Sequence, residues 1–410
     1  MLIGIDGNEA NVERKVGISE YAFELLMQFY DSRFKIPSGA TAIAGKQDLG
    51  FQIFLKDEPR SDLPKEREGW KYIVVGPRKI WTQIGLPISL YLRKPRPDVF
   101  FSLTHYAPRF SPIPTAIAIM DMSFIHFPEL FAKRDLYQLT RWTAYSAKNA
   151  RKIFTISKAS KDDILREYHM PEKDVIVTYP GLKEMSNVKF LISNFQLLRE
   201  KYNISGDYIL FVGTLQPRKN IARLIEAFSQ IIHHRHPELV SGSSSGLRSN
   251  NNDSGQARMT EKLQLVIVGK KGWLYEEILE APDKFGVSEN VIFLDYVPNE
   301  DLPLLYKNAK CYVLPSLYEG FGLPVLEAMQ YGCPVITSNV SSLPEAGGDA
   351  ALYVDPQSTE NIADKIKQVL DSKKLREEMI KKGYQHLKKF SWEKAAKETL
   401  EVLQSLAKGS

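Results

Sequence analysis

The amino-acid sequence predicts an α/β protein built from two doubly wound parallel-sheet domains. Three observations lead to this prediction. Short runs rich in Val, Ile and Phe alternate with stretches of helical period, which is typical of βαβ units. The alternation stops near residue 184 and restarts near residue 206. The chain of 410 residues is also longer than one ordinary core accommodates.

The first domain is expected to span residues 1–183. Its predicted strands are MLIGIDG, FQIFLK, KYIVVG, DVFFSL, TAIAIMD, KIFTIS and VIVTYPG. Its predicted helices are ISEYAFELLMQFY, IWTQIGLPISLYLRK, RDLYQLTRWTAYSAKNA and ASKDDILREYH. Both sets follow from hydrophobic periodicity, which is close to two residues in strands and 3.6 in helices.

A polar, helix-like segment, residues 184–205, is expected to link this domain to a second one at residues 206–385. The strands predicted there are YILFVGT, LQLVIVG, VIFLDYV, CYVLPS, PVITS and ALYVD. From Thr359 to Lys408 the strand signal disappears and three helices are expected. The last of them, within residues 386–410, has Ser391 as its predicted N-cap.

Residues 236–262 interrupt this pattern with a segment rich in Ser, Asn and Gly. Because the segment lacks apolar anchors, we interpret it as a disordered surface insertion. An active-site lid is the alternative interpretation.

The composition is that of a globular protein, with 43% hydrophobic and 25% charged residues. No apolar run is long enough to cross a membrane and no export signal is recognisable, which favours a cytoplasmic protein. Cys311 and Cys333 lack metal-ligand or redox spacing and are expected to be reduced and buried. The net charge of +5 favours anionic ligands or a lipid headgroup surface, without the basic and aromatic clusters typical of nucleic-acid binding.

The stretch SLYEGFGLPVLEA, residues 316–328, follows a predicted strand and opens a predicted helix. Pro324 suits the first helical position, and the free N–H groups there form an anion site at the carboxyl end of a parallel strand. Glu319 and Glu327 flank this site. Carboxylates on both sides of a phosphate fit a ligand with hydroxyl-rich sugars on both sides, such as a nucleoside diphosphate sugar.

At these residues the sequence resembles the retaining glycosyltransferase family 4, a group of GT-B enzymes also described as glycosyl transferases group 1, and its mannosyltransferase-like members. EGFGLPVLE matches the family's E-x7-E signature. The resemblance continues through IMDMSFIHFPE, TISKASKDDI, FVGTLQPRKN, VGKKGW and FLDYVPNEDLPLLY and leaves out only the Ser/Asn-rich segment. It implies two Rossmann-like domains facing a cleft, with a C-terminal helix that crosses back to the first domain.

The resemblance also implies roles for donor-binding residues. Glu319 is expected to contact hydroxyls of the transferred sugar and Glu327 the ribose, with the backbone of Phe321, Gly322 and Leu323 holding sugar and phosphate.

Arg218 and Lys219, which follow the strand YILFVGT, are expected to stabilise the leaving diphosphate. Gly17 is expected to approach the diphosphate from the first domain, and Lys270 and Val297, beside Tyr296, to line the base.

The catalytic centre departs from the family, because many relatives carry a His-Asp pair where this chain has Met120 and Asp121. Asp121 is our candidate for a group near the anomeric centre or the acceptor hydroxyl. His126 is the nearest histidine that could substitute, although a packed loop histidine is the better interpretation. His105 is a candidate on the acceptor side.

Retention of anomeric configuration is implied by the resemblance. The transferred sugar is expected to be a hexose, with mannose favoured. The enzyme is expected to move it from a GDP- or UDP-sugar to a glycan or lipid-linked acceptor in surface polysaccharide synthesis. No metal or other cofactor is expected, because no two aspartates stand two positions apart as in an Asp-x-Asp metal site.

The helix predicted within residues 132–152 mixes basic and aromatic side chains, so peripheral contact with the inner face of a membrane and ordinary packing both remain open. Three other functions also remain open: a nucleotide-sugar epimerase of the same fold, a non-catalytic nucleotide-sugar-binding protein and, least favoured, a dinucleotide oxidoreductase.

Overall fold

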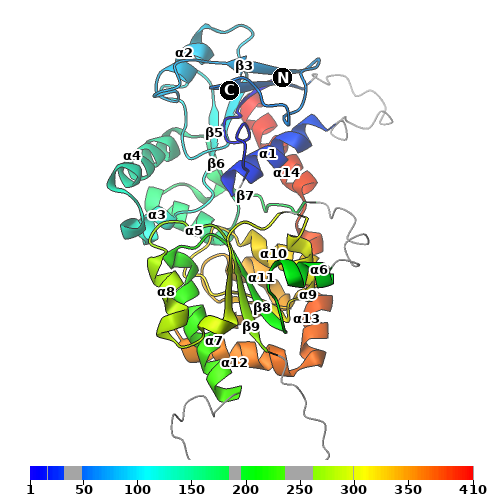
Figure 1. The fold of residues 1–410 in the computed structure, drawn as a ribbon. Coiled ribbons are helices and arrows are strands. Elements are labelled where there is room, and N and C mark those ends of the chain that lie inside the picture. Colours follow the sequence, from blue (N-terminus) through cyan, green and yellow to red (C-terminus); the bar gives the residue numbers. More distant parts are fainter. Residues whose placement is uncertain (16, 32–48, 184–194, 236–261, 299, 410) are drawn as a thin grey trace, which may run out of the picture. The chain divides into compact units, whose positions relative to one another are not determined.

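The computed structural model describes the chain except for residues 16, 32–48, 184–194, 236–261, 299 and 410 (Figure 1). All but the last residue of the Ser/Asn-rich segment therefore lies outside the described residues, as does the first half of the expected linker. The described chain forms two compact units. The first contains Met1–Leu182 and Lys389–Ser410, and the second contains Lys183–Lys388.

The first unit is built on a seven-stranded parallel sheet with the order β3-β2-β1-β4-β5-β6-β7. Its strands are β1 (Leu2–Asp6), β2 (Gly50–Leu55), β3 (Trp70–Val74), β4 (Val99–Ser102), β5 (Thr115–Ala118), β6 (Lys152–Thr155) and β7 (Val175–Val177). Its helices are α1 (Ile18–Tyr30), α2 (Gly85–Leu92), α3 (Ser123–His126), α4 (Lys133–Asn149), α5 (Lys158–Tyr168) and α14 (Trp392–Lys408).

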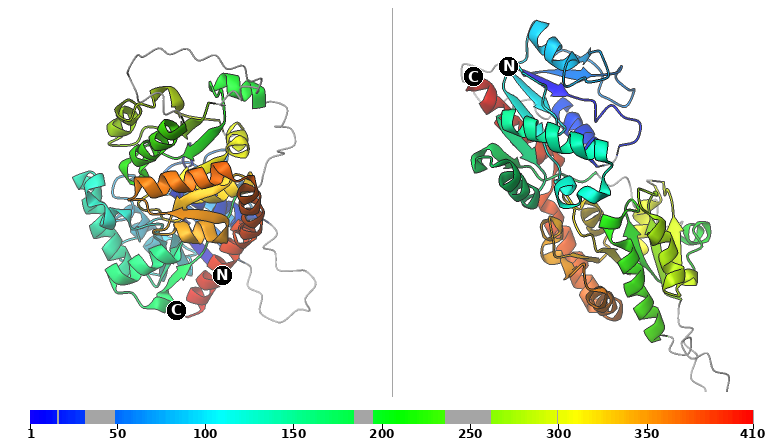
Figure 2. Two further views of the ribbon diagram at one scale, coloured as in Figure 1. Left: turned by 90° about the horizontal axis from the view of Figure 1, so that it is seen from below. Right: turned by 90° about the vertical axis from the view of Figure 1, so that its left-hand side faces the viewer.

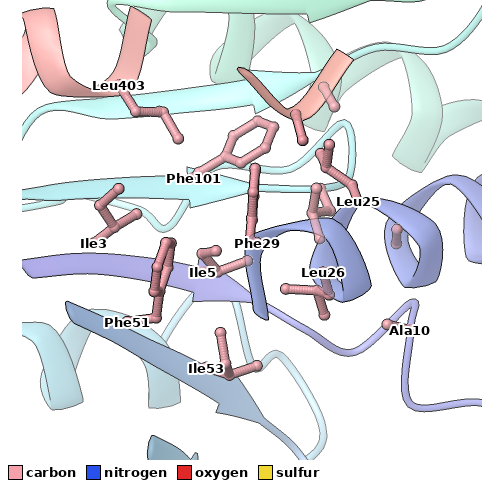
Figure 3. Packing of buried hydrophobic residues seen from close by; sticks show 14 of the residues in the cluster. Ile3, Ile5, Ala10, Leu25, Leu26, Phe29, Phe51, Ile53, Phe101 and Leu403 are labelled. Carbon is pink, nitrogen blue, oxygen red and sulfur yellow. The ribbon is translucent and has the colours of Figure 1, made fainter. Parts of the chain in front are cut away.

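The two faces of this sheet bury different helices because successive strand residues point to opposite sides. On β5, Ala116 and Ala118 face a core shared with α1 and α14, whereas Ile117 faces a core shared with α4 and α5. Figure 3 shows the first of these cores, in which Ile3 and Ile5 of β1 lie among Leu25, Leu26 and Phe29 of α1 and Leu403 of α14.

The final helix belongs to the first unit although it is last in sequence. Its approach requires a glycine, because a Cβ on Gly181 would lie 2.2 Å from the backbone nitrogen of Trp392. Ser391 caps this helix by accepting a hydrogen bond from the backbone N–H of Lys394, as the sequence predicts.

The second unit carries a six-stranded parallel sheet with the order β10-β9-β8-β11-β12-β13. Its strands are β8 (Tyr208–Val212), β9 (Gln264–Val268), β10 (Val291–Leu294), β11 (Cys311–Leu314), β12 (Val335–Ser338) and β13 (Ala351–Val354). Its helices are α6 (Phe195–Lys201), α7 (Ile221–Arg235), α8 (Glu276–Lys284), α9 (Leu302–Asn308), α10 (Leu323–Gln330), α11 (Leu343–Gly347), α12 (Thr359–Asp371) and α13 (Lys373–His386). Figure 2 shows the helices that pack around both sheets.

All the predicted strands are present, and the helix predicted from ISEYAFELLMQFY has the same ends as α1. The helix predicted over residues 80–94 is wrong in extent, because α2 spans only Gly85–Leu92. Ile80 has a φ of 52°, in the left-handed region that ends a right-handed helix, and the indole N–H of Trp81 donates to the carbonyl of Val75. Among the described residues, no helix combines the length and the apolar character needed to span a bilayer.

Candidate active site

The predicted donor-binding residues of the second unit all follow adjacent strands at the carboxyl edge of its sheet. Val297 follows β10, Lys270 follows β9, Lys219 follows β8 and Glu319 follows β11. These four strands are neighbours in the sheet order, so the topology gathers these residues at one edge. This edge is where doubly wound sheets bind ligands.

The turn between β11 and α10 has the geometry of an anion site. Gly322 precedes the helix with a φ of 101°, and Pro324 lies in its first turn, one position later than the sequence predicts. Two features disfavour any side chain at Gly322. Its backbone conformation favours glycine, and a Cβ there would lie 2.8 Å from Leu343 Cδ2. The backbone of Phe321, Gly322 and Leu323 thus forms a tight turn at the N-terminus of α10.

Glu319, Arg218 and Lys219 form one buried ion cluster. The Lys219 Nζ donates to Glu319 Oε1 at 2.6 Å, and the Arg218 Nη1 donates to Glu319 Oε2 at 3.2 Å. Glu319 and Lys219 are only 6% and 8% exposed. The sequence predicts all three residues at the site, with Glu319 at the sugar hydroxyls and both cations at the diphosphate. The structure brings both cations into direct contact with Glu319.

Two opposing effects set the ionisation of Glu319. Burial alone would raise the pKa of this carboxyl, but the charges of Lys219 and Arg218, with hydrogen bonds from Lys219 and Ser316, outweigh burial and lower it to about 2. Glu319 is therefore an anion at neutral pH. The Glu319 carboxylate fixes the positions of Lys219 and Arg218, and their positive charges keep this carboxylate ionised.

Three serines that the sequence analysis did not identify complete the surroundings of Glu319. Ser316 Oγ donates to the carboxylate at 2.7 Å, and Ser341 Oγ and Ser342 Oγ donate to the Glu319 carbonyl at 2.5 and 2.8 Å. Ser341 and Ser342 lie on the loop after β12, more than twenty positions away in sequence. No local motif reveals this contact, although both serines follow a predicted strand at the same sheet edge.

Glu327 lies on α10, and the buried hydroxyl of Tyr306 from α9 orients its side chain. Tyr306 Oη donates to Glu327 Oε2 at 3.1 Å, and Tyr306 is 0% exposed. Burial, with the nearby charge of Glu327, raises the pKa of Tyr306 well above its ordinary value, so the hydroxyl keeps its proton and acts as a donor. Glu327 is partly exposed and retains surface for a ligand.

Tyr306→Phe is expected to weaken nucleotide binding about fivefold to tenfold with little loss of stability, since it removes one hydrogen bond to a charged group. Calorimetric titration with the nucleoside diphosphate measures the effect. Tyr312→Phe is the matched control, because this equally buried hydroxyl donates to the Val212 carbonyl instead. Equal affinity of Tyr306→Phe and wild type would exclude the orienting role.

On the expected base side, Lys270 and Tyr296 contact each other, with the Lys270 Nζ 5.4 Å from the Tyr296 ring centroid. Tyr296 is 63% exposed, whereas the neighbouring Val297 is 5% exposed. The geometry thus brings Lys270 and Tyr296 together and leaves the Tyr296 ring available for stacking. It places the Val297 side chain in the interior.

Gly17, the first unit's predicted diphosphate contact, stands at the N-terminus of α1 with φ 57° and ψ −118°. A Cβ there would meet no other atom within 4 Å, so the backbone conformation, and not crowding, favours glycine. The residue is exposed and leaves the helix start open.

Asp121 follows β5 at the carboxyl edge of the first sheet. Its Oδ1 accepts hydrogen bonds from the backbone N–H and the hydroxyl of Ser123, at 2.9 and 2.7 Å. The preceding Met120 is 7% exposed, and its side chain belongs to the core between the sheet and α14. The residue that stands where many relatives have histidine therefore contributes to packing in this chain.

His105, on the loop after β4, is electrostatically coupled to Asp121. Burial lowers the pKa of His105, and the charge of Asp121 partly offsets this effect. The buried Nδ1 atom of His105 has no hydrogen-bond partner among the described residues. His105 is thus the histidine that the structure associates with Asp121.

His126 is held elsewhere. Its Nε2 lies 2.9 Å from Asp163 Oδ2 on α5, and the same carboxylate accepts a hydrogen bond from Arg166 at 2.6 Å. This arrangement favours a packing role for His126, which is the last residue of α3 and not a loop residue.

Asp121→Asn is expected to lower transfer about 100-fold or more while changing the melting temperature little. The amide keeps an oxygen that accepts from Ser123, so the local turn persists, whereas the negative charge is lost. Parallel measurement of turnover and thermal unfolding checks this. Full activity with a strongly lowered melting temperature would make Asp121 a structural residue.

Comparison with known proteins identifies the family of this chain. Residues 203–386 match the family model described as glycosyl transferases group 1. The O-antigen chain mannosyltransferase B of Escherichia coli is 32% identical over 288 residues, covering 70% of this chain and 69% of that protein. The chain belongs to the glycosyl transferases group 1 family. It is accordingly a glycosyltransferase of the hexosyltransferase class.

Other relatives in this family include the serotype-specific mannosyltransferase WbdA of Escherichia coli, 28% identical over 64% of this chain but only 30% of that longer protein. Among solved structures, sucrose-phosphate synthase from Thermosynechococcus elongatus superposes with a TM-score of 0.66, with both chains covered fully and 18% identity. Anabaena HepE, solved in complex with UDP-glucose, gives a TM-score of 0.67, with 98% of this chain and 99% of that chain covered and 16% identity. These similarities show the GT-B fold.

Proposed function

We propose that this glycosyltransferase moves a mannosyl group from a nucleoside diphosphate mannose to a glycan or lipid-linked acceptor in surface polysaccharide synthesis, with retention of anomeric configuration. The observation that carries the proposal is the buried cluster of Glu319, Arg218 and Lys219 beside the helix start at Gly322. Mannose is favoured because several similar proteins, among them the O-antigen chain mannosyltransferase B and WbdA of Escherichia coli, are named mannosyltransferases.

In the proposed reaction, the bond between the sugar C1 and the β-phosphate oxygen breaks, and a bond between C1 and the acceptor oxygen forms on the same face. The acceptor proton passes to the departing phosphate oxygen, so no enzyme nucleophile is needed. Arg218, Lys219 and the α10 N-terminus supply fixed positive charge where negative charge develops. Because Glu319 already holds both cations, little reorganisation accompanies the step.

Asp121 and His105 are the proposed groups of the first unit near the acceptor. An anionic Asp121 stabilises positive charge that develops at the anomeric carbon. His105 stays largely neutral because its pKa is lowered, so it adds no opposing charge. Glu327, oriented by Tyr306, holds the ribose.

The experiment that tests this function combines a thermal-stability screen of nucleotide sugars with product analysis. GDP-mannose, UDP-mannose, GDP-glucose and UDP-glucose are compared, because a ligand at about 100 times its Kd stabilises the folded state by roughly 2.7 kcal/mol. We expect a mannose donor to give the largest shift and to be consumed when an acceptor is added. A donor converted to its sugar epimer without acceptor would indicate an epimerase. A donor that binds but is neither transferred nor slowly hydrolysed would indicate a binding protein.

A further inference from the structure

Helix α2 of the first unit is apolar on its outer face as well as on its inner face. Its inner face places Leu86 and Leu90 in a core with Trp81. On the outer side of α2 stand Ile88 and Leu92, and Ile80 and Ile84 precede the helix at the same spacing of four residues. We call these four residues the α2 ridge, and they are 52% (Ile80), 43% (Ile84), 52% (Ile88) and 77% (Leu92) exposed.

Backbone hydrogen bonds link three of these residues. The N–H of Ile84 donates to the carbonyl of Ile80 and the N–H of Ile88 to that of Ile84, each at 3.0 Å, so the segment before α2 is tied to the helix. A helix at the surface of a globular protein normally presents polar residues to water. In GLPISLYL, only Ser89 and Tyr91 carry a polar side-chain atom.

Phe110 extends the apolar surface from a neighbouring loop. The N–H of Arg109 donates to the carbonyl of Thr82 at 2.9 Å, which fixes this loop beside the start of the ridge. Phe110 is 73% exposed, and both Phe110 and Ile80 have left-handed backbones, with φ of 50° and 52°. Such conformations are costly for bulky side chains and persist only where the surrounding structure holds them.

The chain segment that carries the ridge has charge of a single sign. Residues 69–97 contain no Asp or Glu, and all six of their basic residues are exposed. These are Lys71, Arg78, Lys79, Arg93, Lys94 and Arg96. One of them, Arg78, pairs with Asp57 from outside the segment. An exposed apolar strip on a segment whose charged residues are all cations is complementary to an anionic lipid surface.

We propose that the α2 ridge docks this glycosyltransferase on an anionic lipid bilayer. The ridge side chains and Phe110 enter the boundary between headgroups and acyl chains, and the surrounding Lys and Arg residues contact lipid phosphates. The start of the ridge follows β3, and Phe110 follows β4, at the same edge of the sheet at which Asp121 follows β5. Docking therefore brings the acceptor side of the proposed site to the membrane.

The α2 ridge replaces the helix that the sequence suggested for membrane contact. On α4, Trp142 packs edge-on against Tyr106 at 5.7 Å between ring centroids, and the Tyr145 hydroxyl accepts a hydrogen bond from the Phe110 N–H at 3.2 Å. Tyr137 is the α4 aromatic that remains 63% exposed. Two of the three aromatic side chains of this helix are thus engaged within the unit, which favours ordinary packing of α4 over membrane contact.

Cosedimentation of the full chain with lipid vesicles tests this proposal without any sugar donor, so its failure is distinguishable from failure of the proposed function. Vesicles of phosphatidylglycerol and phosphatidylcholine are compared with vesicles of phosphatidylcholine alone. We expect binding to the anionic vesicles that weakens with salt. The double variant Ile84→Asp with Ile88→Asp should bind at least tenfold more weakly, and Lys79→Glu with Lys94→Glu should bind at least fivefold more weakly.

Two single variants are matched controls. Leu197→Asp on α6 changes a residue that is 63% exposed on the second unit, and Tyr137→Asp changes the exposed aromatic of α4. Both should bind vesicles as the wild type does. The proposal is overturned if the ridge variant binds like wild type, if Tyr137→Asp alone abolishes binding, or if the wild type binds no anionic vesicles. Light scattering that showed a dimer of the wild type and a monomer of the ridge variant, without vesicle binding, would assign the ridge to self-association instead.

Discussion

Replacing Glu319 with alanine is expected to reduce stability and transfer together. The substitution leaves Lys219 and Arg218 close to each other, with Lys219 buried and its counter-ion removed. Breaking a buried ion pair by removing one partner typically costs about 3 to 5 kcal/mol. Transfer should fall as well, because the two cations lose their fixed positions at the leaving diphosphate. Denaturant unfolding and steady-state turnover measure the two effects separately.

The pH dependence of stability gives an independent check on this cluster. The folded-state pKa of Glu319 is about 2, below its ordinary value of 4.5. The stabilisation is therefore complete above pH 4.5 and is lost as the pH falls toward 2, with a size on the order of 3 kcal/mol. Glu319→Gln, which keeps an acceptor for Ser316, should remove this contribution. An unchanged acid-unfolding profile in that variant would contradict the ion cluster.

Loss of either cation is expected to have the largest effect on catalysis. Lys219→Ala or Arg218→Ala should each cost about 2 to 4 kcal/mol of transition-state stabilisation, or roughly 30-fold to 1,000-fold in kcat/KM. The reason is that each removes one preorganised donor from the place where the leaving diphosphate gains charge. Single-turnover kinetics with saturating donor separates this loss from weaker binding.

Lys310→Ala is the matched control for these variants. Lys310 also forms an ion pair, with Asp207 at 2.9 Å, but it precedes β11 and therefore lies at the opposite, amino edge of the same sheet. Its removal should leave kcat/KM within about twofold of wild type, as expected for a surface ion pair. A comparable loss in Lys310→Ala would mean that the effect of Lys219→Ala reflects general charge or stability and not leaving-group chemistry.

Local sequence signals predicted the parts of the fold that depend on short-range pattern. Strand runs such as LQLVIVG and the helix at residues 18–30 are recognisable because period and turn residues agree within one segment. The site at Glu319 was predicted for the same reason, since strand, glycine turn and proline are contiguous. The start of α2 at Gly85, five residues later than predicted, could not be foreseen, because the left-handed conformation of Ile80 is imposed by its surroundings and contradicts the preference of isoleucine.

Contacts between distant segments account for what the sequence left out. The pairing of Lys219 with Glu319 spans 100 positions, and that of Tyr306 with Glu327 spans 21. Lys219, Glu319 and Glu327 were predicted at the site, but Tyr306 and the contacts between these distant residues were not. Met120 illustrates the converse, because a departure from the family's motif gave no indication of its place in the core.

The central claim is that two fixed cations and a helix N-terminus offset the charge of the departing diphosphate. Transfer from the nucleotide sugar, measured after the protein and all reagents have been stripped of divalent metals by exhaustive chelation, tests it most directly. The account predicts that turnover persists in the stripped wild type and that Lys219→Ala stays impaired whether or not magnesium is added. Turnover that vanished with the chelator and returned with magnesium would contradict it.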